Sequence, residues 1–109
     1  MKQSIKFEIE LDANHLPLKI EMKASEVASN ESNLKALMLS AWTVKTKETL
    51  RIDLWTKDMP VNEMFIMYHQ TMMGMADTLD RSTGHGKLAD ALRDYCEFFV
   101  EETKIKETK

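Results

Sequence analysis

Hydrophobic and polar residues alternate with a period of two in four stretches of the chain. The first two stretches run from about Ser4 to Asp12 and from about Leu16 to Lys23. This period predicts β-strands with one buried face and one solvated face. The intervening turn, Ala13–His15, contains Asn14, a residue type that tolerates the left-handed conformation of tight turns. The N-terminal region is therefore expected to form a β-hairpin.

The other two stretches run from about Ala36 to Thr43, where the alternation weakens, and from Glu48 to Trp55. If their apolar faces align, Ala41 pairs with Leu50 and a second hairpin forms. The core face of the second strand is then expected to hold Leu50, Ile52 and Leu54. The opposite, outer face carries two tryptophans, a methionine and two charged residues, namely Met38, Trp42, Arg51, Asp53 and Trp55.

The segment Ala24–Lys35 separates the two predicted hairpins and is rich in Ser, Asn and Glu. It shows neither the period of a strand nor that of a helix, so a loop is predicted, with one helical turn around Ser25–Ala28. Loops of this length are often functional.

After the fourth strand the hydrophobic period changes to that of a helix. Asp58 is expected to cap the N-terminus of a helix that has Pro60 in its first turn and runs to about Asp80. Its central apolar stripe is Val61, Phe65, Tyr68, Met72, Ala76 and Leu79. A second amphipathic helix is expected over about Lys87–Glu102, and Gly84 is available for a left-handed cap between the two.

Four strands followed by two helices predict an α+β fold. The expected architecture is a four-stranded antiparallel sheet with both C-terminal helices packed on one face (ββββαα). The length of 109 residues fits a single domain over residues 1–109, in which about 103–109 form a frayed tail.

Composition excludes several classes of function. A net charge of -3 argues against nucleic-acid binding, which depends on dense Lys and Arg. The single cysteine, Cys96, cannot form an internal disulfide. Neither an N-terminal signal sequence nor an apolar run of about 20 residues is present, so a cytoplasmic location without membrane insertion is expected.

The polar residues offer little catalytic chemistry. His15, His69 and His85 stand apart from one another, and none has a second His or Cys at the spacing of metal ligands. Cys96 is expected to be a small buried hydrophobic residue rather than a nucleophile. No metal, no cofactor and no catalytic residue is therefore expected.

The outer face of the second hairpin is the more informative feature, because Trp, Met and Arg are enriched at the centres of protein interfaces. Exposure to a protein partner is one interpretation of this face. The alternative is that the tryptophans fold over the sheet edge or pack beneath the 24–35 loop.

Several segments of the chain together resemble the gliding-motility protein GldC family. These segments are Ile9–Asp12, His15–Pro17, Glu48–Val61, His69–Thr71, Met75–Thr78 and Arg93–Phe99. The resemblance covers nearly the whole chain and contains no chemical motif. It implies a small accessory protein of the bacterial gliding apparatus, and it transfers no catalytic residue to this sequence.

Two hypotheses about function follow. In the first, the chain is a non-enzymatic interaction protein of the motility machinery that acts through a protein partner or as a homo-oligomer. In the second, it is a small-ligand-binding protein or an enzyme with a pocket between sheet and helices, using Tyr68, His69 or Asp53.

Overall fold

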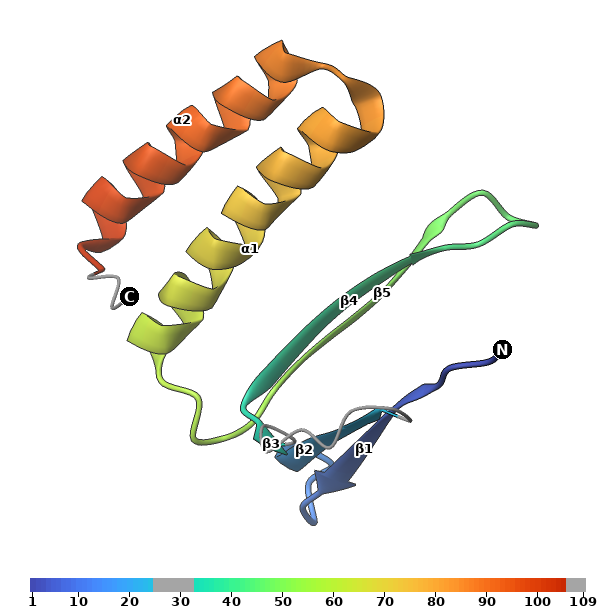
Figure 1. Ribbon diagram of the computed structural model, residues 1–109. Helices are drawn as coiled ribbons and strands as arrows, with labels where there is room; N and C mark the ends of the chain where they lie inside the picture. Colours follow the sequence, from blue (N-terminus) through green and yellow to red (C-terminus); the bar gives the residue numbers. More distant parts are fainter. Residues whose placement is uncertain (25–32, 106–109) are drawn as a thin grey trace. The chain divides into compact units, whose positions relative to one another are not determined.

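The computed structural model describes residues 1–24 and 33–105 and shows an α+β chain in which strands precede two helices, as predicted. The chain forms two compact units, Met1–Met59 and Pro60–Lys109. All the strands belong to the first unit and both helices to the second, and each unit is described by itself (Figure 1). The predicted single domain and the packing of the helices on the sheet stay predictions.

The first hairpin consists of β1 (Ile5–Leu11) and β2 (Pro17–Ala24). They pair antiparallel from Ile5↔Ala24 to Glu10↔Lys19, with an irregularity where Leu11 meets Pro17. Asp12 organises the turn, because its Oδ1 accepts hydrogen bonds from the N–H groups of Asn14, at 2.8 Å, and Leu16, at 3.0 Å. The left-handed residue is His15, with φ 62°, rather than the expected Asn14.

A fifth strand, β3 (Asn33–Leu34), lies in the segment predicted to be a loop. It pairs with β2 through Ile20↔Leu34 and Glu21↔Asn33. Two residues are too few to show a period, which explains why the sequence pattern did not reveal this strand. The rest of the predicted loop, with its helical turn, lies outside the described residues.

The second hairpin consists of β4 (Ala36–Trp42) and β5 (Thr49–Trp55). Its register contains the predicted pair Ala41↔Leu50 and runs from Ala36↔Trp55 to Trp42↔Thr49. The five strands form a three-stranded sheet, β1-β2-β3, and a two-stranded sheet, β4-β5, where one four-stranded sheet was expected.

The hydrophobic core of the first unit is centred on Ile20, which is 0% exposed. Leu54 is half-buried, but Leu50 and Ile52 are 53% and 40% exposed. The prediction that all three face the core is therefore wrong for Leu50 and Ile52. Both residues lie nearer the β4–β5 turn than Leu54 does. The first sheet does not pair along this part of the hairpin, because its last strand, β3, ends before β4 begins.

The second unit is an antiparallel helical hairpin of α1 (Val61–Thr83) and α2 (Gly86–Thr103). The N-cap residue of α1 is Pro60, which provides no side-chain hydrogen bond to the helix. The prediction that Asp58 caps this helix is therefore wrong. Asp58 instead accepts a hydrogen bond from the Thr56 hydroxyl at 2.6 Å. Gly84 ends α1 in the left-handed conformation, as predicted, with φ 69°. The imidazole Nδ1 of His85 caps α2 by accepting the N–H of Leu88 at 3.2 Å.

Small residues form the seam between the two helices. Ala76 and Ala89 are 0% exposed and Cys96 is 1% exposed, so the backbones approach closely at these positions. The rings of Phe65 and Phe99 meet edge to face across the seam, with centroids 5.9 Å apart. The predicted apolar stripe of α1 is only partly correct, because its first member, Val61, is 69% exposed.

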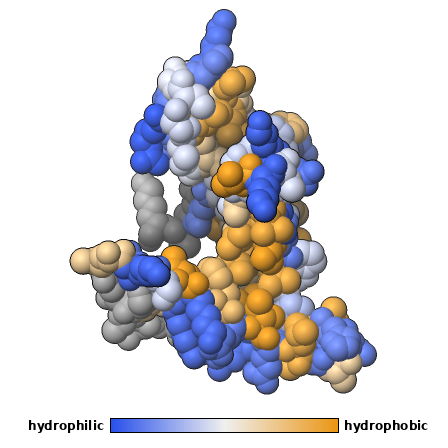
Figure 2. Space-filling model, turned by 90° about the vertical axis from the view of Figure 1, so that its right-hand side faces the viewer, coloured by the Kyte–Doolittle hydropathy of each residue, from blue (hydrophilic) through white to orange (hydrophobic). Residues whose placement is uncertain are grey.

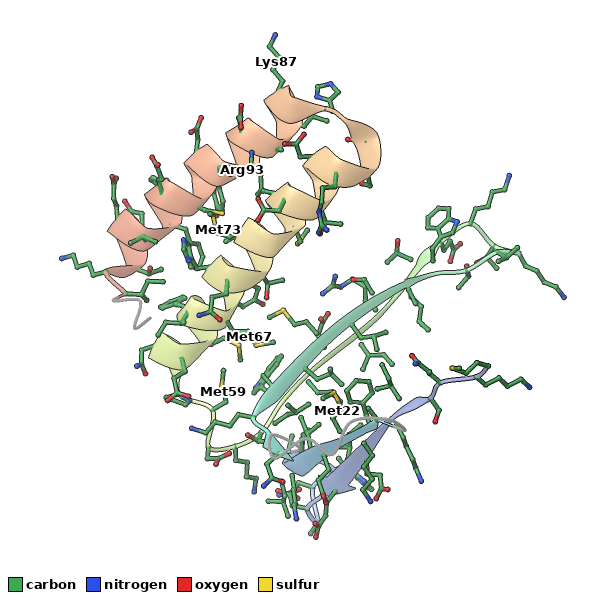
Figure 3. The ribbon with its side chains drawn as sticks, viewed as in Figure 1. Met22, Met59, Met67, Met73, Lys87 and Arg93 are labelled. Atoms are coloured by element: carbon green, nitrogen blue, oxygen red, sulfur yellow. The ribbon has the colours of Figure 1, made fainter. Side chains whose placement is uncertain are left out.

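One side of the helical hairpin is polar. Arg93 on α2 donates to Asp77 on α1 at 2.9 Å and to Asp90 on its own helix at 2.8 Å (Figure 3). The hydrogen bond to Asp77 is the main cause that raises the pKa of the guanidinium. This ion pair links the two helices to each other.

Candidate functional site

The structure places all five residues of the predicted partner surface on one face of the β4–β5 hairpin. Met38 pairs with Asp53, Ser40 with Arg51, Trp42 with Thr49 and Ala36 with Trp55. These pairs alternate along the ladder with those of the leucine face, so their side chains share one side of the ribbon. We call this side the outer face; it consists of Ala36, Met38, Ser40, Trp42, Thr49, Arg51, Asp53 and Trp55.

The centre of the outer face is polar and ordered by hydrogen bonds. Arg51 donates from Nη2 to Asp53 Oδ1 at 2.6 Å and from Nε to Asp53 Oδ2 at 3.3 Å, a two-pronged ion pair along one strand. The same guanidinium donates from Nη1 to the Ser40 hydroxyl at 2.6 Å on the neighbouring strand. These bonds hold the Arg51 side chain flat across both strands and fix its orientation.

The two tryptophans lie at opposite ends of this polar centre. Trp42 is 67% exposed and Trp55 is 58% exposed. Trp42 lies six positions after Ala36, the residue paired with Trp55, so the two tryptophans are about 20 Å apart along the ladder. Figure 2 shows hydrophobic surface reaching the outside of the molecule between hydrophilic regions. The outer face therefore offers two separate aromatic contacts rather than one aromatic cluster.

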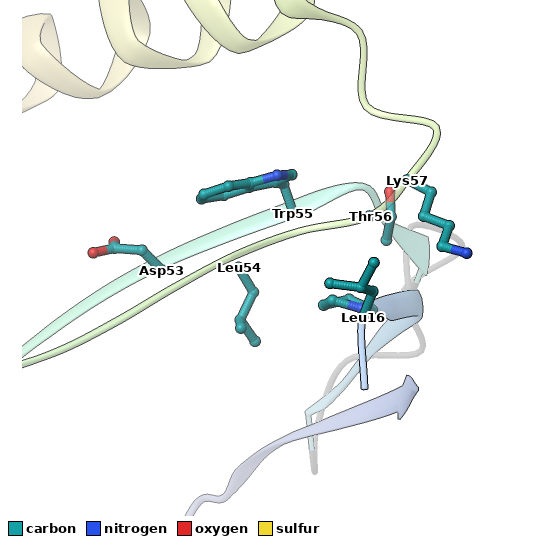
Figure 4. A pocket seen from close by; sticks show the side chains of 7 residues that line it. Leu16, Asp53, Leu54, Trp55, Thr56 and Lys57 are labelled. Atoms are coloured by element: carbon teal, nitrogen blue, oxygen red, sulfur yellow. The ribbon is translucent and has the colours of Figure 1, made fainter. Parts of the chain in front are cut away.

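A small pocket of about 200 Å³ lies where the end of β5 meets the turn of the first hairpin. Leu16, Pro17 and Leu54 supply its apolar lining, and Trp55 and Asp53 of the outer face also border it. In Figure 4, Trp55 and Asp53 project from one side of β5 and Leu54 projects from the other. The pocket is thus continuous with one end of the outer face.

Polar contacts beside this pocket close the end of the second hairpin and join it to the first. Thr56, 3% exposed, donates from its N–H at 2.7 Å and from its hydroxyl at 3.0 Å to the carbonyl oxygen of Lys35. Lys57 forms an ion pair with Asp12 Oδ2. The Lys57 ammonium, together with the N–H groups of the turn, lowers the pKa of the Asp12 carboxyl.

Other chemically reactive groups are dispersed or buried. Cys96 lies in the helix seam, where burial raises the pKa of its thiol and disfavours the thiolate. His69 is 8% exposed on α1, and Tyr68 beside it is 45% exposed. These two belong to the second unit and Asp53 to the first. Across residues 1–24 and 33–105, no group of three His, Cys, Asp or Glu side chains is arranged to hold a metal ion.

Sequence analysis missed the contacts that fix this site. The Asp12–Lys57 ion pair joins residues from distant parts of the chain, and no period in the sequence signals it. The Lys35–Thr56 pair is the next step of the predicted β4–β5 register, but its side-chain hydrogen bond was not anticipated. The one available signal was the polar run Thr56–Asp58 directly after a strand, which was interpreted as a helix cap.

Fold and site together define a small α+β protein whose most distinctive surface is an exposed strand hairpin bearing two tryptophans. A family model described as "Gliding motility-associated protein GldC-like" matches residues 17–105. The chain belongs to this GldC-like family, which confirms the resemblance seen in its sequence. Searches of curated proteins and of solved structures find no match. In the part of the chain that the structure describes, neither helix is long and apolar enough to cross a membrane.

Proposed function

We propose that this protein is a non-enzymatic, cytoplasmic interaction protein of the bacterial gliding-motility machinery, and that a protein partner binds its outer face. Membership of the GldC-like family supports the connection with motility. The observation that carries the choice of surface is the exposure of Trp42 and Trp55 on either side of the ordered Arg51–Asp53 pair.

This arrangement has the composition of a protein-binding surface. Trp and Arg are the residue types that most often dominate interface energetics, and a guanidinium already held by Asp53 and Ser40 loses little freedom when a partner binds. Two indoles about 20 Å apart suit a partner surface of ordinary extent rather than a small molecule.

Small-ligand binding has less support. The open pocket bordered by Trp55 has a volume of about 200 Å³, less than the roughly 300–1,000 Å³ of typical ligand sites. Two hollows of the helical unit reach about 580 and 460 Å³, but both are open grooves on its surface. A single apolar side chain of a protein partner fits the pocket bordered by Trp55 better than a cofactor does.

The test is affinity capture with the full chain from a lysate of a gliding bacterium that contains this family, followed by identification of the captured proteins. Trp42→Ala and Trp55→Ala should each weaken capture of the motility partner about 30-fold, as expected for hot-spot residues worth about 2 kcal/mol. Leu50→Ala is the matched control, because Leu50 is 53% exposed on the opposite face of the same hairpin. Unchanged capture by a folded double tryptophan variant would refute the outer face as the binding surface.

A further inference from the structure

One edge of β4 pairs with β5, and among the described residues no strand pairs with its other edge. An unpaired strand edge presents a row of N–H and C=O groups that can pair with another strand. The neighbouring sheet does not extend along this edge, since its ladder between β2 and β3 ends at Ile20↔Leu34, before β4 begins.

The hydrogen bonds at both ends of the hairpin show which residues of β4 present these groups. The Thr43 N–H donates to the Glu48 carbonyl at 3.0 Å, and the Thr56 N–H donates to the Lys35 carbonyl at 2.7 Å. Both pairs continue the β4–β5 register, and in both the residue on the β4 side, Lys35 or Thr43, is odd-numbered. Hydrogen-bonded and non-hydrogen-bonded pairs alternate in an antiparallel ladder, so the odd-numbered residues of β4 bond to β5. The even-numbered residues Met38, Ser40 and Trp42 therefore direct their backbone N–H and C=O groups toward the free edge.

The sequence of β4 differs from those of the two other edge strands of seven residues, β1 and β5, while the fourth edge strand, β3, has only two residues. β1 carries Lys6, Glu8 and Glu10, and β5 carries Arg51 and Asp53. The seven residues of β4, ALMLSAW, include neither a charged residue nor a proline. Charges and prolines are the usual means by which edge strands resist pairing, so β4 is the edge best suited to accept another strand.

We propose that β4 pairs antiparallel with β4 of a second copy of this chain. The two-fold axis passes midway between Ser40 of one copy and Ser40 of the other. In this register Ser40 faces Ser40 of the second copy, and Met38 faces Trp42 of the second copy. Met38, Ser40 and Trp42, whose backbone groups point to the free edge, then all form hydrogen-bonded pairs with the second copy. The two hairpins become one four-stranded sheet, a size at which strands are much more stable than in an isolated ribbon.

A second copy suits this edge because the contacts are self-complementary. A thioether packs favourably against an indole, and the two-fold axis produces that Met38–Trp42 contact twice. β4 itself carries no charge, and the Arg51 guanidinium that reaches Ser40 beside the axis is already paired with Asp53. This inference goes beyond the proposed function and does not depend on it, although pairing would join the two outer faces into one wider surface.

Sedimentation equilibrium of the full chain tests the proposal, and the wild-type chain is expected to dimerise. Ser40→Pro removes an N–H that points to the free edge and keeps the backbone hydrogen bonds to β5, although the hydroxyl that accepts from Arg51 is lost. It should raise the dimer dissociation constant at least about tenfold. Thr49→Pro is the matched control, because the N–H of Thr49 points to the opposite edge of the same hairpin, and it should leave dimerisation unchanged.

Charge variants keep the proposal falsifiable if Ser40→Pro fails to fold. Ser40→Lys and Ser40→Glu should each weaken self-association, because like charges would face each other across the axis. An equimolar mixture of the two variants should dimerise more tightly than either alone. A wild-type chain that stays monomeric up to about 1 mM, or a wild-type dimer that none of the Ser40 variants weakens, would overturn the proposal.

Discussion

The two β-hairpins of the first unit have ladders of nearly equal length and opposite surface chemistry. In β1–β2, charged side chains pair across and along the strands, as in Lys23–Glu8 at 3.1 Å and Lys19–Glu21 at 3.4 Å. In β4–β5, β4 is uncharged and the tryptophans at the two ends of the outer face are exposed. The first hairpin thus holds the buried Ile20, whereas no residue of β4 or β5 is fully buried. Apolar side chains are exposed in both hairpins, for example Leu11 and Leu18 in the first and Leu50 and Ile52 in the second. This contrast separates the part of the unit that stabilises it from the part that is available for binding.

The largest expected effect comes from removing the core residue of the first hairpin. Ile20→Ala should lower the free energy of unfolding by about 3 kcal/mol, because it deletes buried methylene groups and leaves a cavity. Chemical denaturation measures this change. The control is Ile9→Ala, since Ile9 pairs directly with Ile20 and is 39% exposed. If Ile52→Ala, at 40% exposure in the second hairpin, destabilises the chain as much as Ile20→Ala, the division between a stabilising and a binding hairpin fails.

The next effect concerns the ion pair that joins the hairpins. Asp12→Asn should lower the melting temperature by a few degrees at neutral pH, because it removes the charge that pairs with Lys57 and weakens acceptance of the turn N–H groups. The variant Lys57→Met, which keeps much of the side-chain length, should lose only the ion pair and show a smaller decrease.

The pH dependence of stability supplies the second measurement on this pair. The pKa of Asp12 lies below its ordinary value of 3.8 in the folded chain. A carboxyl of this kind contributes stability that is fully present above that value and is lost as the pH falls through the folded pKa. The wild-type chain should therefore lose stability below about pH 4 more steeply than Asp12→Asn does. Parallel curves for the two chains would show that Asp12 does not link the hairpins electrostatically.

The same contrast explains what could be predicted from the sequence. Alternation predicted both hairpins, although it is weak in the β4 segment, and alignment of the apolar faces predicted the β4–β5 register, because a slip of one residue would exchange the two faces. The family was also predicted correctly from the sequence. Alternation could not show that Leu50 and Ile52 stay exposed, since it reports which side a residue faces and not what covers that side. Whether the outer face binds a partner stays a prediction.

The helix-capping rule failed at Asp58, because a hydroxyl two residues earlier in the chain competes for its side chain. Asp58 has the position and residue type of an N-cap, but the hydroxyl of Thr56 donates to it instead. That hydrogen bond lowers the pKa of the Asp58 carboxyl. Thr56 is in turn held by Lys35, 21 residues earlier in the chain. Propensity rules describe neighbours in sequence, so a tertiary contact of this kind overrides them.

The smallest expected effect compares two exposed ion pairs, one in each hairpin. Glu8→Gln removes the carboxylate whose pKa is lowered by Lys23 and Lys6. It should reduce thermal stability slightly, and added salt should abolish the difference from the wild-type chain. Asp53→Asn removes the partner of Arg51 on the outer face. It should leave thermal stability almost unchanged but weaken partner capture severalfold, because the guanidinium is no longer held in place. Glu8→Gln should capture the partner as the wild-type chain does, so equal capture by the two variants would remove the functional distinction between the hairpins.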